Sequence, residues 1–110
     1  MHTLIIAEAG VNHNGDFEIA KRMIDVAKEA GVDIVKFQTS ITSTSKFSEK
    51  AEYQKRETGA NESQLDMIKK LRFSFEQHTK LKEYCDQVGI TYLSTGFDFE
   101  SIQFLDELGC

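Results

Sequence analysis

The sequence predicts an α/β fold in which three consecutive βα units build a parallel sheet. Three short apolar runs, at residues 3–8, 33–38 and 90–95, each precede a segment with helical periodicity. Strands of a parallel sheet are buried on both faces, so they read as continuous apolar runs. The order strand–helix, repeated three times, therefore indicates parallel strands joined by right-handed crossovers.

The first helix is expected between residues 16 and 31. Asp16 is a natural N-cap, and Gly31 is a natural C-terminal stop. Apolar side chains recur on one helical face, and charged side chains lie largely on the other. The apolar positions are Ile19, Ala20, Met23, Ile24, Ala27 and Ala30.

Capping patterns mark the remaining helices. Ser74 and Gln77 form a capping box, and Gly89 ends that helix. Its expected buried stripe consists of Leu81, Tyr84, Cys85 and Val88. A shorter helix is expected over 61–71, and a last helix begins near Asp98. The last helix is expected to bury Ile102, Leu105 and Leu108.

Residues 39–60 interrupt this rhythm with a stretch rich in Ser, Thr and Lys. The stretch is too long for a simple connection in a compact domain, which favours a functional loop. The hydroxyls of 39–45 could bind phosphate, although such a loop is more often only solvated.

Composition excludes several classes of function. The 110 residues suffice for one domain, and the net charge of −5 argues against a nucleic-acid-binding surface. No apolar run is long enough to span a membrane, and the N-terminus lacks the pattern of a signal peptide. Cys85 and Cys110 have neither disulfide nor zinc spacing, so we expect a cytoplasmic protein.

The spacing of the βα units fits both a doubly wound sheet and a (β/α)8 barrel. A complete barrel needs roughly 250 residues. We therefore expect either the first three βα units of such a barrel, incomplete as given, or a small open sheet.

Polar side chains gather where the predicted strands end. Glu8 ends the first strand, Lys36 and Gln38 lie on the second, and Ser94 and Thr95 end the third. The carboxyl ends of the strands are where α/β folds bind ligands. If the first two strands are neighbours, Glu8 and Lys36 can meet at this edge of the sheet.

Several roles are open for Lys36 on pattern alone. A lysine inside a strand needs a partner, because burying an unpaired ammonium is costly. It could form a purely structural ion pair with Glu8, or it could bind a phosphate or carboxylate. A Schiff-base role is a further possibility, since lysines on barrel strands serve that chemistry.

The first strand runs into Asn12-His13-Asn14-Gly15. Asn-Gly favours positive φ, so turn formation explains Asn14 and Gly15. It explains His13 poorly, although a lone histidine is more often structural than catalytic. His78 lies near the apolar stripe of its helix and is expected to be structural, and Cys85 to be a small core residue.

Five segments carry a resemblance to a known family: "IIAEAGVNHNGD", "AKRMIDVAKEAGVDIVKFQT", "AEYQ", "ESQLDMIKKL" and "YLSTGFD". They resemble the N-terminal part of the N-acetylneuraminate (sialic acid) synthase family, which includes legionaminic and pseudaminic acid synthases. The resemblance covers essentially the whole chain. It implies that residues 1–110 are the N-terminal portion of a synthase (β/α)8 barrel, without a separate second domain.

The resemblance implies condensation of phosphoenolpyruvate with an N-acetylated hexose, such as N-acetylmannosamine, to give a nonulosonic acid and phosphate. A divalent metal, typically manganese, would activate the open-chain aldehyde. This is not Schiff-base chemistry. In the family the metal-binding histidines lie in later strands, so their counterparts are expected beyond Cys110. A homodimer is implied for the longer protein.

The resemblance also implies roles for individual residues. Lys36 would bind the phosphate of phosphoenolpyruvate, Thr95 its carboxylate, and Gln38 the sugar. Glu8 would act at the reacting centre by orienting the sugar or assisting proton transfer.

The resemblance places Asn12 and His13 in the loop at the mouth of the site. Tyr53 and Gln54 would lie in a loop that closes near the sugar. One departure concerns Gly96, which stands where the family usually has proline.

Two other functions compete with this one. A related phosphoenolpyruvate-condensing barrel would make a different keto-deoxy sugar acid. A non-catalytic binding module would keep only half of the site. We expect residues 1–110 alone to be inactive, and to be unstable or to associate through exposed sheet edges.

Overall fold

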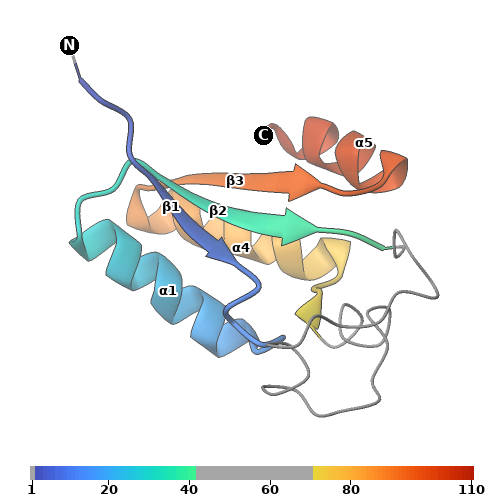
Figure 1. The fold of residues 1–110 in the computed structure, drawn as a ribbon, viewed down its shortest axis with the longest axis horizontal. Coiled ribbons are helices and arrows are strands. Elements are labelled where there is room, and N and C mark those ends of the chain that lie inside the picture. Colours follow the sequence, from blue (N-terminus) through green and yellow to red (C-terminus); the bar gives the residue numbers. More distant parts are fainter. Residues whose placement is uncertain (1, 42–70) are drawn as a thin grey trace, which may run out of the picture.

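The computed structural model describes residues 2–41 and 71–110. Six helices and strands follow one another in these ranges: β1 (Ile6–Gly10), α1 (Phe17–Glu29), β2 (Ile34–Thr39), α4 (Phe75–Val88), β3 (Thr91–Gly96) and α5 (Phe99–Leu108) (Figure 1). The expected strand–helix order is confirmed. The helix expected over 61–71 and most of the loop at 39–60 lie outside the described residues.

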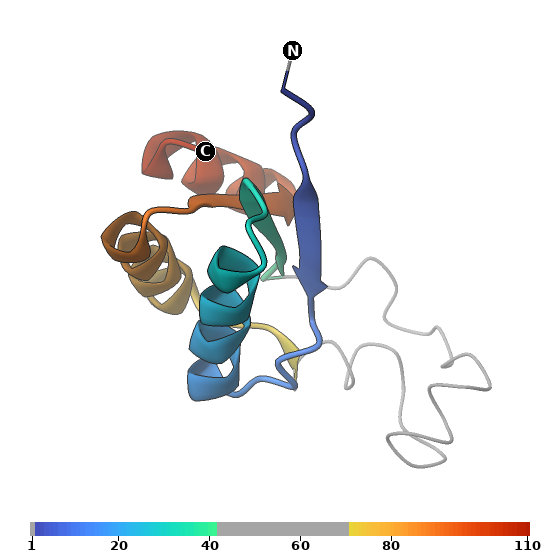
Figure 2. The ribbon, with the colours of Figure 1, turned by 90° about the vertical axis from the view of Figure 1, so that its left-hand side faces the viewer.

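The strands form a parallel sheet in the order β1-β2-β3, and the three described helices lie on one side of it (Figure 2). Along β2, Val35, Phe37 and Thr39 are buried against the helices. Lys36 and Gln38 alternate with them and point to the face that none of the described helices covers, here called the uncovered face. A doubly wound sheet would carry helices on both faces, so this arrangement is that of the first βα units of a barrel.

The first strand is displaced from its expected position at residues 3–8. Pairing with β2 begins at Ile6↔Ile34 and continues to Gly10↔Phe37. The register shifts by one residue between Glu8 and Gly10. Leu4 and Ile5 are exposed. The backbone N–H of Ile5 donates to the Asp33 carboxylate at 2.9 Å, which fixes the chain before the strand.

Helix α1 begins and ends as expected. The Asp16 carboxylate accepts from the backbone N–H of Glu18 at 2.9 Å and of Ile19 at 3.2 Å. Gly31 follows the helix with φ +83°, a conformation that few other residues adopt. The buried residues of α1 are Ala20, Ile24 and Ala27.

Two residues expected in the buried face of α1 are exposed, and a third is only partly buried. Ile19 and Ala30 are exposed and Met23 is only partly buried. They line an apolar groove of about 420 Å³ between α1 and the free side of β1. The side of α1 that carries these residues faces the groove. The periodicity of the helix shows which residues share a side, but it does not show which side faces the core.

The caps of α4 and α5 also match the expectation. Ser74 and Gln77 bond reciprocally at 2.9 and 3.1 Å, and Gly89 ends α4 with φ +83°. On α5 the Asp98 carboxylate accepts from the Ser101 N–H at 2.7 Å. The expectation for Ile102 is wrong: it is 54% exposed, because α5 is rotated so that Ser101 and Leu105 face the sheet.

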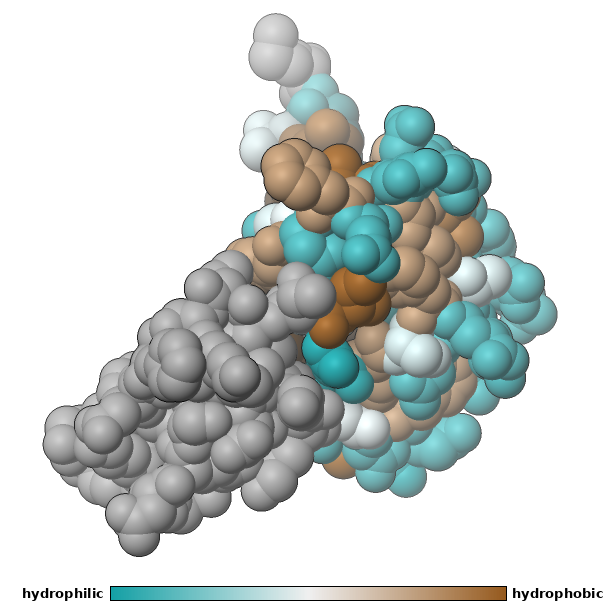
Figure 3. Space-filling view, turned by 90° about the vertical axis from the view of Figure 1, so that its right-hand side faces the viewer, coloured by the Kyte–Doolittle hydropathy of each residue, from teal (hydrophilic) through white to brown (hydrophobic). Residues whose placement is uncertain are grey.

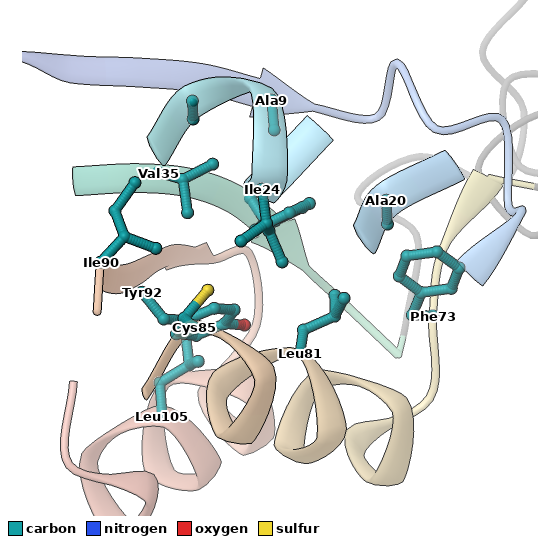
Figure 4. Packing of buried hydrophobic residues seen from close by; sticks show 12 residues of the cluster. Ala9, Ala20, Ile24, Val35, Phe73, Leu81, Cys85, Ile90, Tyr92 and Leu105 are labelled. Carbon is teal, nitrogen blue, oxygen red and sulfur yellow. The ribbon is translucent and has the colours of Figure 1, made fainter. Parts of the chain in front are cut away.

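The core lies between the sheet and the helices (Figure 4). Ile24 of α1, Val35 of β2 and Leu81 of α4 meet there, and Leu105 extends the core to α5. Cys85 is fully buried, and burial raises the pKa of its thiol to about 12, which fits the expected core role.

Apolar side chains also reach the surface. Val26 and Ile6 are exposed near the free side of β1, and Phe99 and Ile102 are exposed beyond β3. Brown apolar surface interrupts the polar surface on the face shown in Figure 3. Among the residues described, no helix combines the length and hydrophobicity needed to cross a membrane.

Candidate functional site

The uncovered face of the sheet brings Glu8 and Lys36 together. The two residues are register partners on β1 and β2, and Lys36 Nζ lies 2.8 Å from Glu8 Oε2. The Lys36 side chain is 33% exposed and the Glu8 side chain 50% exposed, so both charges remain accessible from solvent. The expected meeting of these residues is confirmed.

Gly10 brings Gln38 into the same cluster. A Cβ added to Gly10 would lie 3.3 Å from Glu8 Oε1 and 3.6 Å from Gln38 Nε2. The glycine has φ +55°, which also disfavours a side chain. Its missing side chain therefore leaves room beside both the carboxylate and the amide. Gly10 was not among the predicted site residues, although a glycine directly after "AEA" at a strand end is a usable signal.

Thr95 completes the row on the uncovered face. It is the register partner of Gln38 across β2 and β3, and it is exposed. Ser94, the preceding residue, points to the helix side instead. Its hydroxyl lies 2.6 Å from that of Thr39.

The loop after β1 is a series of tight turns. The N–H of Asn12 donates to the carbonyl of Ala9 at 3.0 Å, and the N–H of Asn14 to that of Val11 at 3.1 Å. Asn14 has φ +54° and Gly15 φ +75°, which confirms the turn chemistry expected for Asn-Gly. Asn12 is exposed at the end of β1.

His13 does not face the ligand side as expected. Its side chain is 1% exposed and its ring stacks on Phe73 with a centroid distance of 4.0 Å. Nδ1 accepts the Gly15 N–H at 2.9 Å, and burial lowers the pKa of His13 to about 4. A neutral ring thus fixes the loop from inside, on the helix side of the sheet, because the tight turns point it toward Phe37 and Phe73.

A buried polar cluster lies behind the ends of β2 and β3. Tyr92 OH lies 2.7 Å from His78 Nδ1, and Thr39 Oγ1 lies 3.4 Å from His78 Nε2. Desolvation, and to a smaller extent the field of His13, lowers the pKa of His78 to about 4. We refer to Thr39, His78, Tyr92 and Ser94 as the buried polar cluster. The sequence analysis identified His78 as structural but did not connect it with the strand ends.

Two expectations fall outside this description. Tyr53 and Gln54 lie outside the described residues. Within 2–41 and 71–110, no group of three or more His, Cys, Asp or Glu side chains is placed to hold a metal ion. The Glu8 carboxylate is already bonded to an ammonium group, so these residues do not fit a metal centre by themselves.

The arrangement suits recognition of an anionic, oxygen-rich ligand. Lys36 supplies a positive charge and hydrogen-bond donors for phosphate or carboxylate oxygens. Gln38 offers an amide donor and acceptor, and Thr95 offers a hydroxyl. Glu8 is the carboxylate in the row and can accept a proton or orient a hydroxyl.

Comparisons with known proteins show which proteins the chain is similar to. The chain is 50% identical to the N,N'-diacetyllegionaminic acid synthase of Legionella pneumophila over 99% of its own length and 31% of that protein. It is 40% identical to human N-acetylneuraminate-9-phosphate synthase, over 94% of this chain and 29% of that protein. The chain thus spans about a third of the length of the curated relatives it matches.

A solved structure shows the same fold. The N-acetylneuraminic acid synthetase of Leptospira borgpetersenii, crystallised with citrate, superposes with a TM-score of 0.77 and 31% identity. The match covers 99% of this chain and 34% of that one. The family model for NeuB proteins matches residues 23–110, most of the sequence. The chain therefore belongs to the NeuB family.

Proposed function

We propose that these residues form part of an enzyme that condenses phosphoenolpyruvate with an N-acetylated hexose, giving a nonulosonic acid and phosphate. The observation that carries the proposal is the row of Glu8, Lys36, Gln38 and Thr95 on the uncovered face of the sheet. Membership of the NeuB family and the likeness to named synthases support the same reaction.

In this proposal the first 110 residues supply one side of a barrel that the longer protein completes. Lys36 binds the phosphate of phosphoenolpyruvate and Thr95 binds its carboxylate. The Glu8–Lys36 pair is half exposed, so an incoming phosphate can share the ammonium group without a large desolvation cost. An ion pair at the mouth of the site thus keeps the lysine in place before the ligand arrives.

Gln38 contacts the sugar, and Glu8 orients a sugar hydroxyl or moves a proton at the reacting carbon. Asn12 contributes from the exposed loop after β1. Tyr53 and Gln54 are proposed to approach the sugar. His13 supports the loop by packing, in place of the direct contact that the resemblance implied.

The remaining parts of the proposal concern the longer protein. A divalent metal, by analogy manganese, would be held by residues outside 2–41 and 71–110 and would polarise the sugar aldehyde. We further propose a homodimer and a cytoplasmic location. The sugar is of the legionaminate or neuraminate type, which the 50% identity to a legionaminic acid synthase favours.

An activity assay on the full-length protein that carries these residues tests the proposal. Phosphoenolpyruvate is supplied with manganese and either N-acetylmannosamine, a diacetylated legionaminate precursor or arabinose 5-phosphate. We expect phosphate release with one of the N-acetylated sugars. Release with arabinose 5-phosphate alone would instead identify a keto-deoxy sugar acid synthase. Binding of phosphoenolpyruvate without turnover of any sugar would identify a non-catalytic module.

A further inference from the structure

The buried polar cluster joins the end of β2 to the neighbouring elements. Thr39 is the last residue of β2 and is fully buried. Its hydroxyl lies 2.6 Å from Ser94 Oγ on β3 and 3.4 Å from His78 Nε2 on α4. One side chain thus contacts both the adjacent strand and the helix that covers it.

His78 also connects Thr39 with β3. Its Nε2 lies 3.4 Å from the Thr39 hydroxyl, and its Nδ1 lies 2.7 Å from the hydroxyl of Tyr92 on β3. Since the ring is buried and Tyr92 is buried beside it, these bonds are shielded from water. The carbonyl of Thr39 additionally accepts the N–H of Phe97 at 3.0 Å, which ties the two strand ends together.

We propose that Thr39 and His78 are positioning residues that fix the ends of β2 and β3, so that Gln38 and Thr95 present their side chains together on the opposite face. Gln38 precedes Thr39 in the chain and pairs with Thr95. Successive side chains of a strand point to opposite faces, so fixing Thr39 on one face fixes Gln38 on the other. The cluster therefore acts on the site through the backbone, without touching a ligand.

A core made only for stability does not need these groups. An apolar side chain of similar shape at position 39 would fill the same space without polar contacts to Ser94 and His78. The hydroxyl instead selects one register and one orientation of the strand ends. This inference rests on the proposed function, because it assigns a purpose to the geometry of Gln38 and Thr95.

The test uses Thr39→Val in the full-length protein, which removes the hydroxyl and keeps the shape of the side chain. Ser94→Ala removes the same hydroxyl–hydroxyl contact from the side of β3. It provides a second test of the contact if Thr39→Val fails to fold. We expect each to raise the KM of the N-acetylated sugar roughly tenfold, while kcat changes less. Thr39→Ser, which keeps the hydroxyl, should restore most of the lost affinity.

Thr79→Val is the matched control, because the Thr79 hydroxyl donates to the Phe75 carbonyl within α4 and does not reach the strand ends. It should leave the KM unchanged. If Thr39→Val and Ser94→Ala lower the melting temperature but keep the wild-type KM, the cluster is structural and the inference is wrong. An inactive wild-type protein would instead contradict the proposed function, which distinguishes the two failures.

Discussion

Glu8 on β1 and Lys36 on β2 are directly opposite in register, and their side chains form an ion pair of 2.8 Å on the uncovered face of the sheet. Both side chains stay partly exposed. An exposed pair of this kind contributes little to stability, typically below about 1 kcal/mol. A role in ligand binding therefore explains the presence of this pair better than a contribution to stability does.

Replacement of Lys36 by Ala should weaken binding of phosphoenolpyruvate about a hundredfold in the full-length protein, since a charge-assisted contact to phosphate is lost. Isothermal titration calorimetry measures the change directly. Lys82→Ala is the matched control, because Lys82 pairs with Asp86 on the outer surface of α4. Unchanged affinity in Lys36→Ala would exclude the phosphate role and leave the purely structural ion pair.

Replacement of Glu8 by Gln should lower kcat by a factor of about 10² or more, while the free energy of unfolding changes by less than about 1 kcal/mol. The amide keeps the size of the side chain but cannot take up a proton. Steady-state kinetics and urea unfolding on the same preparation separate the two effects. A variant that loses stability but retains wild-type kcat would show that Glu8 serves the fold alone.

Gly10→Ala tests the room that Gly10 leaves beside Glu8 and Gln38. We expect it to cost about 1–2 kcal/mol through its positive φ, and also to lower kcat/KM about tenfold by crowding Glu8 Oε1. Gly31→Ala is the matched control: Gly31 has φ +83° and no neighbouring atom within 4 Å of an added Cβ. It should show the stability cost without the kinetic one. Equal kinetic losses in both variants would argue against a specific role of Gly10.

Local signals predicted most of the fold. Asp16, Ser74 and Asp98 cap their helices as expected, because a cap depends on a few adjacent residues. The rotation of each helix about its axis depends on the neighbouring elements. Helical periodicity therefore predicts Ile19 and Ile102 in the core, whereas both lie at the surface.

For the site, too, local sequence patterns predicted some features, and others depend on the folded arrangement. The ion pair of Glu8 and Lys36 followed from strand alternation and from the adjacency of the strands. Gly10 was missed because its role depends on the irregular register of β1, and His13 was misplaced because the tight turns after the strand direct its ring inward. The contact between Thr39 and Ser94 needs the exact pairing of β2 with β3, which sequence alone does not provide.

Gly96 stands where the resemblance to the synthase family implies a proline. A Cβ built on it would lie 2.8 Å from Ile102 Cγ1 and 3.0 Å from the backbone nitrogen of Ile102. Gly96→Ala should therefore destabilise the protein by about 1–3 kcal/mol, because α5 must move outward. Proline also carries a Cβ and meets the same obstacle.

Urea unfolding of the full-length protein measures this cost. Adding Ile102→Ala to Gly96→Ala should recover only part of it, since the backbone nitrogen remains in place. Ile102→Ala alone should change stability little, because the side chain is half exposed. A Gly96→Ala variant as stable as the wild type would show that α5 adjusts freely.

Because His13 and His78 are buried, we predict that the free energy of unfolding falls in mild acid. Burial lowers the pKa of His13 and of His78 from 6.5 to about 4 in the folded state. Between these values the unfolded chain binds protons that the folded chain does not, so stability falls as the pH falls from about 6.5 to about 4. At pH 5.5 the two residues together should cost about 3 kcal/mol relative to pH 7.5.

Urea unfolding of the full-length protein at pH 7.5 and pH 5.5 measures this difference, and His78→Gln supplies the comparison. Glutamine does not titrate, and its amide can hydrogen-bond in place of the imidazole ring. The variant should therefore lose about half of the pH dependence, whatever its absolute stability. If wild type and variant lost the same free energy between the two pH values, His78 would be protonated in the folded state and its burial would not govern its charge.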